Sequence, residues 1–129
     1  MGVTILIVDD NTRLRALIRR LLVREPDLHI VGEAANGTDA ILMAHQLQPD
    51  IVLMDLVMPR LSGLEAMRRI KMDRPVTKVI ITTVHSENAY LKAAEASGTD
   101  AFLIKKTLMT TLVPTIRRLL GCMSPPNTP

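Results

Sequence analysis

The segment Ile51–Gly63 reads IVLMDLVMPRLSG, and its order of residues decides how the rest of the chain is interpreted. Its first four residues are apolar, which is typical of a strand buried on both faces of a parallel sheet. The apolar run ends at Asp55, and Pro59 prevents the strand from continuing. Ser62, followed three residues later by Glu65, has the pattern of a helix capping box. We therefore expect Asp55 at the carboxyl end of a central strand, where open α/β sheets bind their ligands.

The composition is that of one soluble globular domain. The chain has 129 residues, of which 47% are hydrophobic and 22% charged, and its formal net charge is +3. Aromatic residues make up only 2%, which disfavours a stacking platform for single-stranded nucleic acid. The single cysteine, Cys122, cannot form an internal disulfide. No apolar run reaches the length of a membrane span, so we expect a cytoplasmic protein that does not act at a membrane.

The rest of the sequence alternates between strand and helix patterns. Four further apolar runs predict strands at Val3–Val8, Leu28–Ala34, Val76–Thr82 and Ala101–Ile104. Helical patterns cover Leu14–Leu22, Thr38–Leu47, Gly63–Met72 and Ser86–Gly98, with a last helix ending near Leu120. Five strands alternating with five helices predict an α/β fold: a flavodoxin-like, doubly wound parallel sheet with strand order 2-1-3-4-5. We assign residues 1–121 to this domain and residues 122–129 to a flexible tail or the start of a linker.

Pro114 conflicts with the pattern of the last helix. Proline is tolerated in the first turn of a helix but not in its interior. We therefore expect the helix to begin at Thr110 or Thr111, with Thr38 capping the second helix and Ser86 the fourth.

Three acids follow two strands that this topology places side by side. Asp9 and Asp10 end the first strand, and Asp55 ends the third. Three neighbouring carboxylates repel one another unless a cation lies among them. An all-oxygen site with few protein ligands suits Mg²⁺, which keeps several of its waters.

Two further polar residues end strands at the same edge of the sheet. Thr83 follows the fourth strand, and Lys105 follows the fifth. A divalent cation, an ammonium group, a hydroxyl group and an acidic acceptor together suit phosphoryl transfer, in which positioning and charge neutralisation supply most of the catalysis. Asp55 would then act as the nucleophile and form an acyl phosphate.

These motifs resemble those of one known family. Asp9-Asp10, Asp55 followed by Met58-Pro59 and Gly63, Thr83, and Lys105 occur in the order and spacing of a CheY-like receiver domain of two-component response regulators. The resemblance covers Val3 to Leu120. It implies a phosphoacceptor rather than an enzyme acting on outside substrates, with self-phosphorylation and autodephosphorylation as its only reactions.

The resemblance also implies roles for individual residues. Asp55 receives the phosphoryl group from a phosphohistidine of a sensor histidine kinase. Asp10, Asp55 and the Val57 carbonyl ligate Mg²⁺, and Asp9 reaches the ion through water. Lys105 pairs with the phosphoryl oxygens. Thr83 and Phe102 report phosphorylation to the face formed by helix 4, strand 5 and helix 5.

Several residues depart from the commonest receiver pattern. Lys106 stands in place of a frequent proline, Val84 in place of a small residue, and Phe102 in place of a frequent tyrosine. With the sequence of residues 32–37, GEAANG, these features are most similar to receivers of NarL/LuxR-type transcriptional regulators. Those regulators carry a C-terminal helix-turn-helix, whereas only nine residues follow Leu120. We therefore expect an excised or stand-alone receiver that affects DNA only through a domain outside this chain.

The same resemblance leads to two further expectations. A homodimer would use helix 1 with helix 5, or the face of helix 4, strand 5 and helix 5. Val57, Val84 and His85 flank the path of the water that hydrolyses the acyl phosphate. Because neither valine can orient that water, we expect a long-lived phosphorylated state.

These residues also allow alternative interpretations. Asp9-Asp10 alone more often caps a helix, and paired arginines more often form a solvated helix face than a nucleic-acid site. A phosphatase of the aspartyl-phosphate type would need a second acid where Val57 stands. A pseudo-receiver, which binds partners independently of phosphate, usually lacks one of the acids or the lysine, and all of them are present here.

Overall fold

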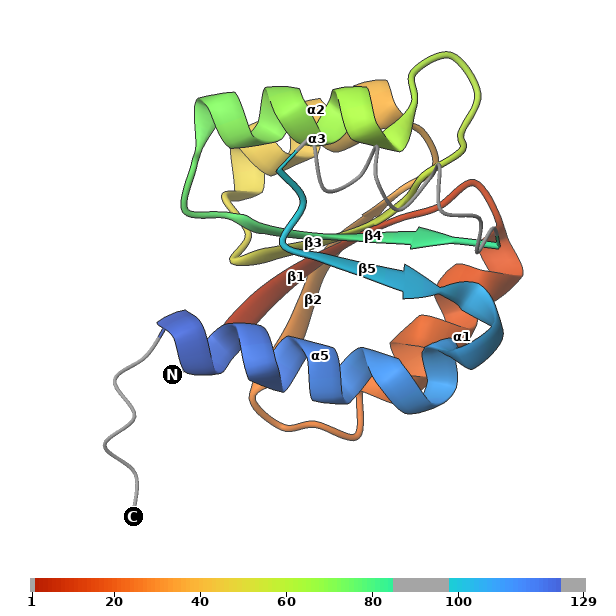
Figure 1. Ribbon diagram of the computed structural model, residues 1–129, viewed down its shortest axis with the longest axis vertical. Helices are drawn as coiled ribbons and strands as arrows, with labels where there is room; N and C mark the ends of the chain where they lie inside the picture. Colours follow the sequence, from red (N-terminus) through yellow and green to blue (C-terminus); the bar gives the residue numbers. More distant parts are fainter. Residues whose placement is uncertain (1, 85–97, 124–129) are drawn as a thin grey trace.

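The computed structural model describes residues 2–84 and 98–123, in which the strands form one parallel sheet. The strand order is β2-β1-β3-β4-β5, as expected for the doubly wound flavodoxin-like fold. The strands span Val3–Val8 (β1), Leu28–Ala34 (β2), Ile51–Asp55 (β3), Lys78–Thr83 (β4) and Ala101–Ile104 (β5). All strands therefore end at the same edge of the sheet, which is on the right in Figure 1.

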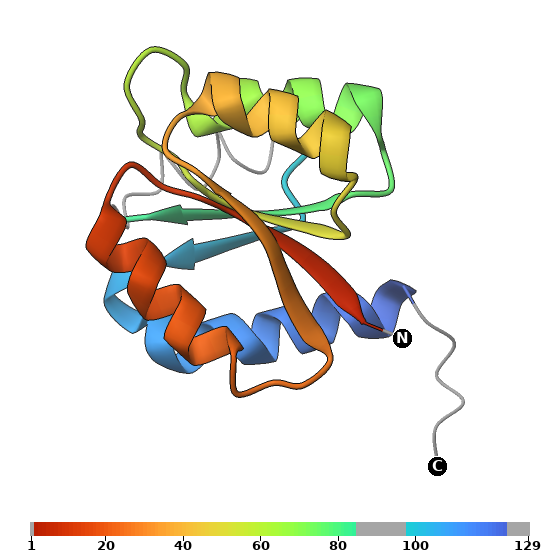
Figure 2. The same cartoon turned by 180° about the vertical axis from the view of Figure 1, so that it is seen from behind.

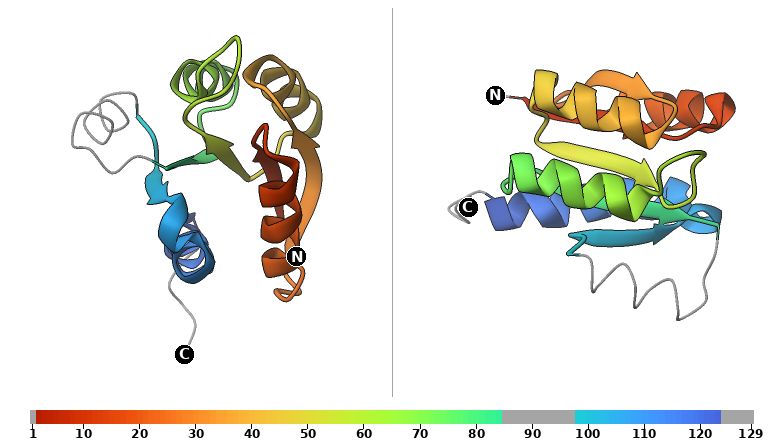
Figure 3. Two further views of the ribbon diagram at one scale, coloured as in Figure 1. Left: turned by 90° about the vertical axis from the view of Figure 1, so that its right-hand side faces the viewer. Right: turned by 90° about the horizontal axis from the view of Figure 1, so that it is seen from above.

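Helices cover both faces of the sheet (Figures 1 and 2). One face carries α2 (Gly37–Leu47) and α3 (Gly63–Asp73), and the other carries α1 (Thr12–Leu22) and α5 (Leu108–Met123). The end-on view of Figure 3 separates the three layers. The helix expected over residues 86–98 lies largely outside the described residues. None of the described helices combines the length and the apolar character that crossing a membrane would require.

Alternation along the buried strands divides the core into two clusters. Ile5, Ile7 and Leu53 pack with α1 and α5, whereas Leu6 and Met54 pack with α2 and α3. Successive side chains of a strand point to opposite faces, so a continuous apolar run supplies both clusters at once. The same alternation determines the face of the sheet to which the residues at the end of each strand point.

Short polar side chains define where the helices start. Asn11 Oδ1 accepts hydrogen bonds from the amides of Arg13 and Leu14, and Ser62 Oγ accepts one from the amide of Glu65. Asn36, rather than the expected Thr38, caps α2 by accepting a hydrogen bond from the amide of Asp39 at 2.8 Å. Because Asn11 caps α1, Asp9 and Asp10 are not needed for that role.

The expected start of the last helix is wrong. A 3₁₀ turn over Lys105–Thr107 leads directly into α5, so Pro114 lies inside the helix. Leu108, Leu112 and Ile116 are buried one turn apart against the sheet. Their burial outweighs the hydrogen bond that a proline in the interior removes. The helix also ends at Met123 instead of near Leu120.

Candidate functional site

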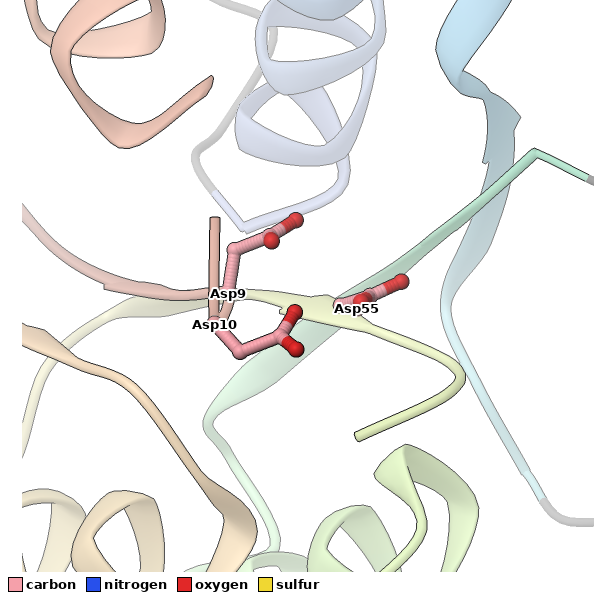
Figure 4. Close-up of side chains that lie close together, drawn as sticks. All are labelled: Asp9, Asp10 and Asp55. Carbon is pink, nitrogen blue, oxygen red and sulfur yellow. The ribbon is translucent and has the colours of Figure 1, made fainter. Parts of the chain in front are cut away.

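Strand register brings Asp9 and Asp55 to the same place. Ile7 pairs with Leu53 across β1 and β3. Asp9, directly after β1, and Asp55, the last residue of β3, each follow two residues later, so both continue the same alternation at the carboxyl edge of the sheet. Figure 4 shows their side chains together with that of Asp10. One carboxylate oxygen from each of the three acids lies within 4.8 Å of the other two.

The three acids differ in their access to solvent. Asp9 is 2% exposed and Asp55 is 6% exposed, whereas Asp10 lies at the surface. Asp9 Oδ1 accepts a hydrogen bond of 2.8 Å from the amide of Asn11, which anchors the start of the loop to α1. The site is therefore a partly buried acidic cluster with one acid facing solvent.

Lys105 links two of the acids. Its Nζ lies 2.8 Å from Asp9 Oδ2 and 3.2 Å from Asp55 Oδ1. The lysine begins the 3₁₀ turn after β5, so a residue distant in sequence delivers the positive charge. This ion pair offsets part of the repulsion among the carboxylates.

Burial and neighbouring charges shift the pKa values of Asp55 and Lys105. Burial and the negative charge of Asp9 raise the pKa of Asp55, and Lys105 with the Val57 amide only partly opposes them. Burial acts against the charged ammonium of Lys105, but contact with Asp9 and attraction by both carboxylates raise its pKa overall. The site thus favours a charged lysine and holds more negative charge than that lysine balances.

The acidic cluster fits a small hard cation. Asp9 Oδ2 is buried and, among the described residues, receives no directed hydrogen bond; the ion pair with Lys105 is its contact. The donors that converge here are all oxygens, the ligand type that Mg²⁺ prefers. A cation would supply the missing positive charge. The Val57 carbonyl stays a predicted ligand.

The structure also describes four other predicted site residues, Thr83, Phe102, Val57 and Val84. Thr83 ends β4 and is buried, and Phe102 lies on the neighbouring strand β5. Phe102 pairs with Ile81, which precedes Thr83 by two residues, so Thr83 and Phe102 belong to the same face of the sheet. Val57 is 55% exposed and Val84 is 69% exposed. His85 lies outside the described residues.

Gly63 allows the loop after β3 to return close to Asp55. A Cβ atom at this position would lie 2.1 Å from the Asp55 carbonyl oxygen. The Gly63 amide donates a hydrogen bond of 2.8 Å to the Leu56 carbonyl, and Arg60 adopts a φ of 73° within the loop. A side chain at residue 63 would therefore force β3 and α3 apart, beside the acidic cluster.

Arg15 is a residue of this region that the sequence motifs did not identify. The Arg15 side chain is only 16% exposed. It donates hydrogen bonds to Glu33 Oε1 at 3.0 Å and to the Asp9 carbonyl at 2.5 Å. The available signal was Arg15 and Arg19 one turn apart, with an acid at the end of a neighbouring strand.

The paired arginines mostly contact acids of this chain. Arg19 pairs with Glu33, Arg68 and Arg69 pair with Glu65, and Arg117 pairs with Glu25 and Asp27. This pattern agrees with solvated helix faces rather than a stripe of arginines facing nucleic acid.

Comparisons with known proteins agree with this geometry. The family model described as "Response regulator receiver domain" matches residues 5–117. The response regulator protein VraR of Staphylococcus epidermidis is 38% identical over 118 residues, covering 92% of this chain and 56% of its own length. This chain therefore spans about half the length of that relative.

Solved structures show the same likeness. A LuxR-family two-component response regulator from Aurantimonas sp. SI85-9A1 has a TM-score of 0.89 at 32% identity, covering 95% of this chain and 87% of that one. The signal receiver domain of the putative response regulator NarL from Mycobacterium tuberculosis has a TM-score of 0.83 at 26% identity, covering 94% and 95%.

Proposed function

Because the chain belongs to the receiver-domain family of two-component response regulators, we propose that Asp55 accepts a phosphoryl group from a phosphohistidine of a sensor histidine kinase. The observation that carries this proposal is the buried Asp55 beside Lys105 and clustered with Asp9 and Asp10. A nucleophile, a cation-binding set and a fixed ammonium are the parts that phosphoryl transfer needs.

The transfer is a displacement at phosphorus. A carboxylate oxygen of Asp55 forms the new O–P bond while the N–P bond of the phosphohistidine breaks, and its electron pair returns to the imidazole. Lys105 leaves its ion pair with Asp55 to neutralise the phosphoryl oxygens. Asp10, Asp55 and the Val57 carbonyl would hold Mg²⁺, with Asp9 one water away, and the ion would stabilise the negative charge that gathers around phosphorus.

Phosphorylation of Asp55 would then be communicated to the surface through Thr83 and Phe102. We propose that the Thr83 hydroxyl donates a hydrogen bond to the phosphoryl group and that Phe102 changes position in response. The location of both residues on one face of adjacent strands supports this coupling. The affected surface would be formed by helix 4, β5 and α5, and it could also serve a homodimer, as could α1 with α5.

The remaining functional assignments follow from the family. The protein would work in the cytoplasm as a phosphoacceptor, not as an enzyme acting on other substrates. Its output would be transcription, through a DNA-binding domain outside these 129 residues. The likeness to VraR and LuxR-family regulators supports that assignment.

A phosphodonor experiment tests the proposal directly. The purified chain is incubated with acetyl phosphate and Mg²⁺, and the modified residue is located by mass spectrometry. We expect phosphate on Asp55, no modification of Asp55→Asn, and strongly reduced modification of Asp10→Asn. Asp73→Asn, a change at an exposed acid at the end of α3, serves as the control and should behave like the parent. Phosphate on another residue, or none at all, would contradict the proposal, and the latter would favour a pseudo-receiver.

A further inference from the structure

Arg15 occupies a polar junction between α1, the end of β2 and the loop that carries Asp9 and Asp10. Its Nε donates to Glu33 Oε1 at 3.0 Å, while its Nη1 donates to the Asp9 carbonyl at 2.5 Å. Two nitrogens of one rigid guanidinium therefore serve two acceptors on different elements. The side chain is 16% exposed, compared with 51% for Arg19.

The contact with Asp9 fixes a peptide group that both acids share. The Asp9 carbonyl belongs to the same planar unit as the Asp10 amide. On the other side of Asp9, its own amide donates a hydrogen bond of 3.0 Å to the Ala34 carbonyl. Ala34 directly follows Glu33, the residue that anchors Arg15. The end of β2 thus holds Asp9 through its amide and, by way of Arg15, through its carbonyl.

We propose that Arg15, anchored by Glu33, is a positioning residue of the metal site, which orients the peptide between Asp9 and Asp10 so that both carboxylates face the cation. The inference rests on the metal site proposed above. Mg²⁺ requires near-ideal octahedral geometry, so a small rotation of this peptide would cost affinity. Groups that orient metal ligands without touching the metal commonly change affinity 10-fold or more when removed.

Arg19 provides a matched control on the same helix. It pairs with the other oxygen of Glu33, and no hydrogen bond to the Asp9 carbonyl is found for it among the described residues. The hydrogen bond from Arg19 lowers the pKa of Glu33 most strongly, ahead of the contribution of Arg15. Both arginines therefore stabilise the ionised Glu33, but only Arg15 connects it to the acidic site.

The first experiment measures Mg²⁺ affinity by isothermal titration in the parent chain, Arg15→Gln and Arg19→Gln. We expect Arg15→Gln to raise the dissociation constant about 10-fold. Arg19→Gln should remain within about twofold of the parent, although both variants lose a partner of Glu33. Arg15→Lys keeps the charge but loses the planar guanidinium with its two donors, so its dissociation constant for Mg²⁺ should be close to that of Arg15→Gln. Equal affinities for Arg15→Gln and Arg19→Gln would overturn the inference.

A second experiment needs no metal. The Asn11 amide donates to Asp9 Oδ1, so its hydrogen exchange reports the order of the loop in EDTA. Exchange should be faster in Arg15→Gln and Arg15→Lys but unchanged in Arg19→Gln. If Arg15→Gln does not fold, Arg15→Lys decides both experiments. A parent that binds no Mg²⁺ would refute the metal site, whereas unchanged Asn11 exchange in both Arg15 variants would refute the role of Arg15 alone.

Discussion

Burial and the negative charge of Asp9 both oppose the ionisation of Asp55. Its pKa is raised, so the free carboxylate makes folding less favourable at neutral pH. An acid whose pKa is raised in the folded state contributes favourably to the free energy of unfolding when it is protonated. That contribution is complete below the pKa of the unfolded state and is lost as the pH rises through the pKa of the folded state. The metal-free domain therefore carries a local destabilisation that a bound cation would relieve.

Asp55→Asn should consequently increase the free energy of unfolding of the metal-free domain at pH 7. The amide keeps the shape of the side chain but carries no charge near Asp9. The gain should disappear as the pH falls towards about 4, where the parent carboxyl is itself protonated. Urea unfolding in EDTA across this pH range measures the effect, and Asp73→Asn should show none of comparable size. A variant that is less stable than the parent at pH 7 would contradict this account.

We expect Val57 to influence how long an acyl phosphate on Asp55 survives. The side chain is 55% exposed beside the site and has no group that could orient an attacking water. Val57→Asn supplies such a group, so we expect dephosphorylation several-fold faster, on the order of 10-fold at most. Loss of acyl phosphate is followed in excess Mg²⁺ without kinase. Val76→Asn, a change at an exposed valine in the segment before β4, is the control. A longer lifetime in Val57→Asn would reverse this interpretation.

At the scale of elements, β3 and α3 meet through Gly63. Gly63→Ala places a methyl group against the Asp55 carbonyl, and we expect a loss of about 1–3 kcal/mol or more in the free energy of unfolding, with weaker phosphorylation. Gly121→Ala is the matched control, because a Cβ atom there meets nothing within 4 Å. That change should instead stabilise α5 by up to about 1 kcal/mol. Chemical denaturation of both variants provides the comparison, and equal stability would argue against the close approach at Gly63.

The last helix keeps a proline in its interior because apolar contacts with the sheet hold it in place. Pro114 is exposed and cannot donate a hydrogen bond to the carbonyl one turn earlier. Pro114→Ala restores that donor, so we expect the free energy of unfolding to rise by about 1–3 kcal/mol. Denaturant titration checks the change, with Thr110→Ala, earlier in the same helix, as a reference. A decrease would mean that Pro114 itself contributes to the packing of the helix.

At the scale of the whole molecule, the binding of a metal ion would be linked to folding. Any cation that binds only the folded chain stabilises it, by about 1.4 kcal/mol at a concentration ten times the dissociation constant. We expect Mg²⁺ to raise the melting temperature of the parent, by roughly 4 °C under those conditions. Asp10→Asn should lose most of this increase, whereas Asp39→Asn at the start of α2 should retain it. An equal response in parent and Asp10→Asn would exclude Asp10 as a ligand.

Local patterns predicted most of the fold. The five apolar runs predicted the strands within a few residues, and their alternation with helices predicted the observed strand order. Asp9 and Asp55 could be placed together because parallel strands have their carboxyl ends at one edge of the sheet. The pairing of Ile7 with Leu53 then aligns the two acids. The apolar and polar pattern of each segment was therefore sufficient to predict the strands and the edge at which the acids meet.

Only the tertiary structure determined which local preference prevailed. Burial of Leu108 against the sheet determined the start of α5 despite Pro114. The hydrogen bond with Glu33 on β2 holds the Arg15 side chain in a position with little exposure to solvent. Lys105 could be assigned to the site from the sequence, but its simultaneous contact with Asp9 and Asp55 could not. Such contacts join residues far apart in the chain. Their energies depend on distance and burial, which arise only once the sheet and its helices have packed.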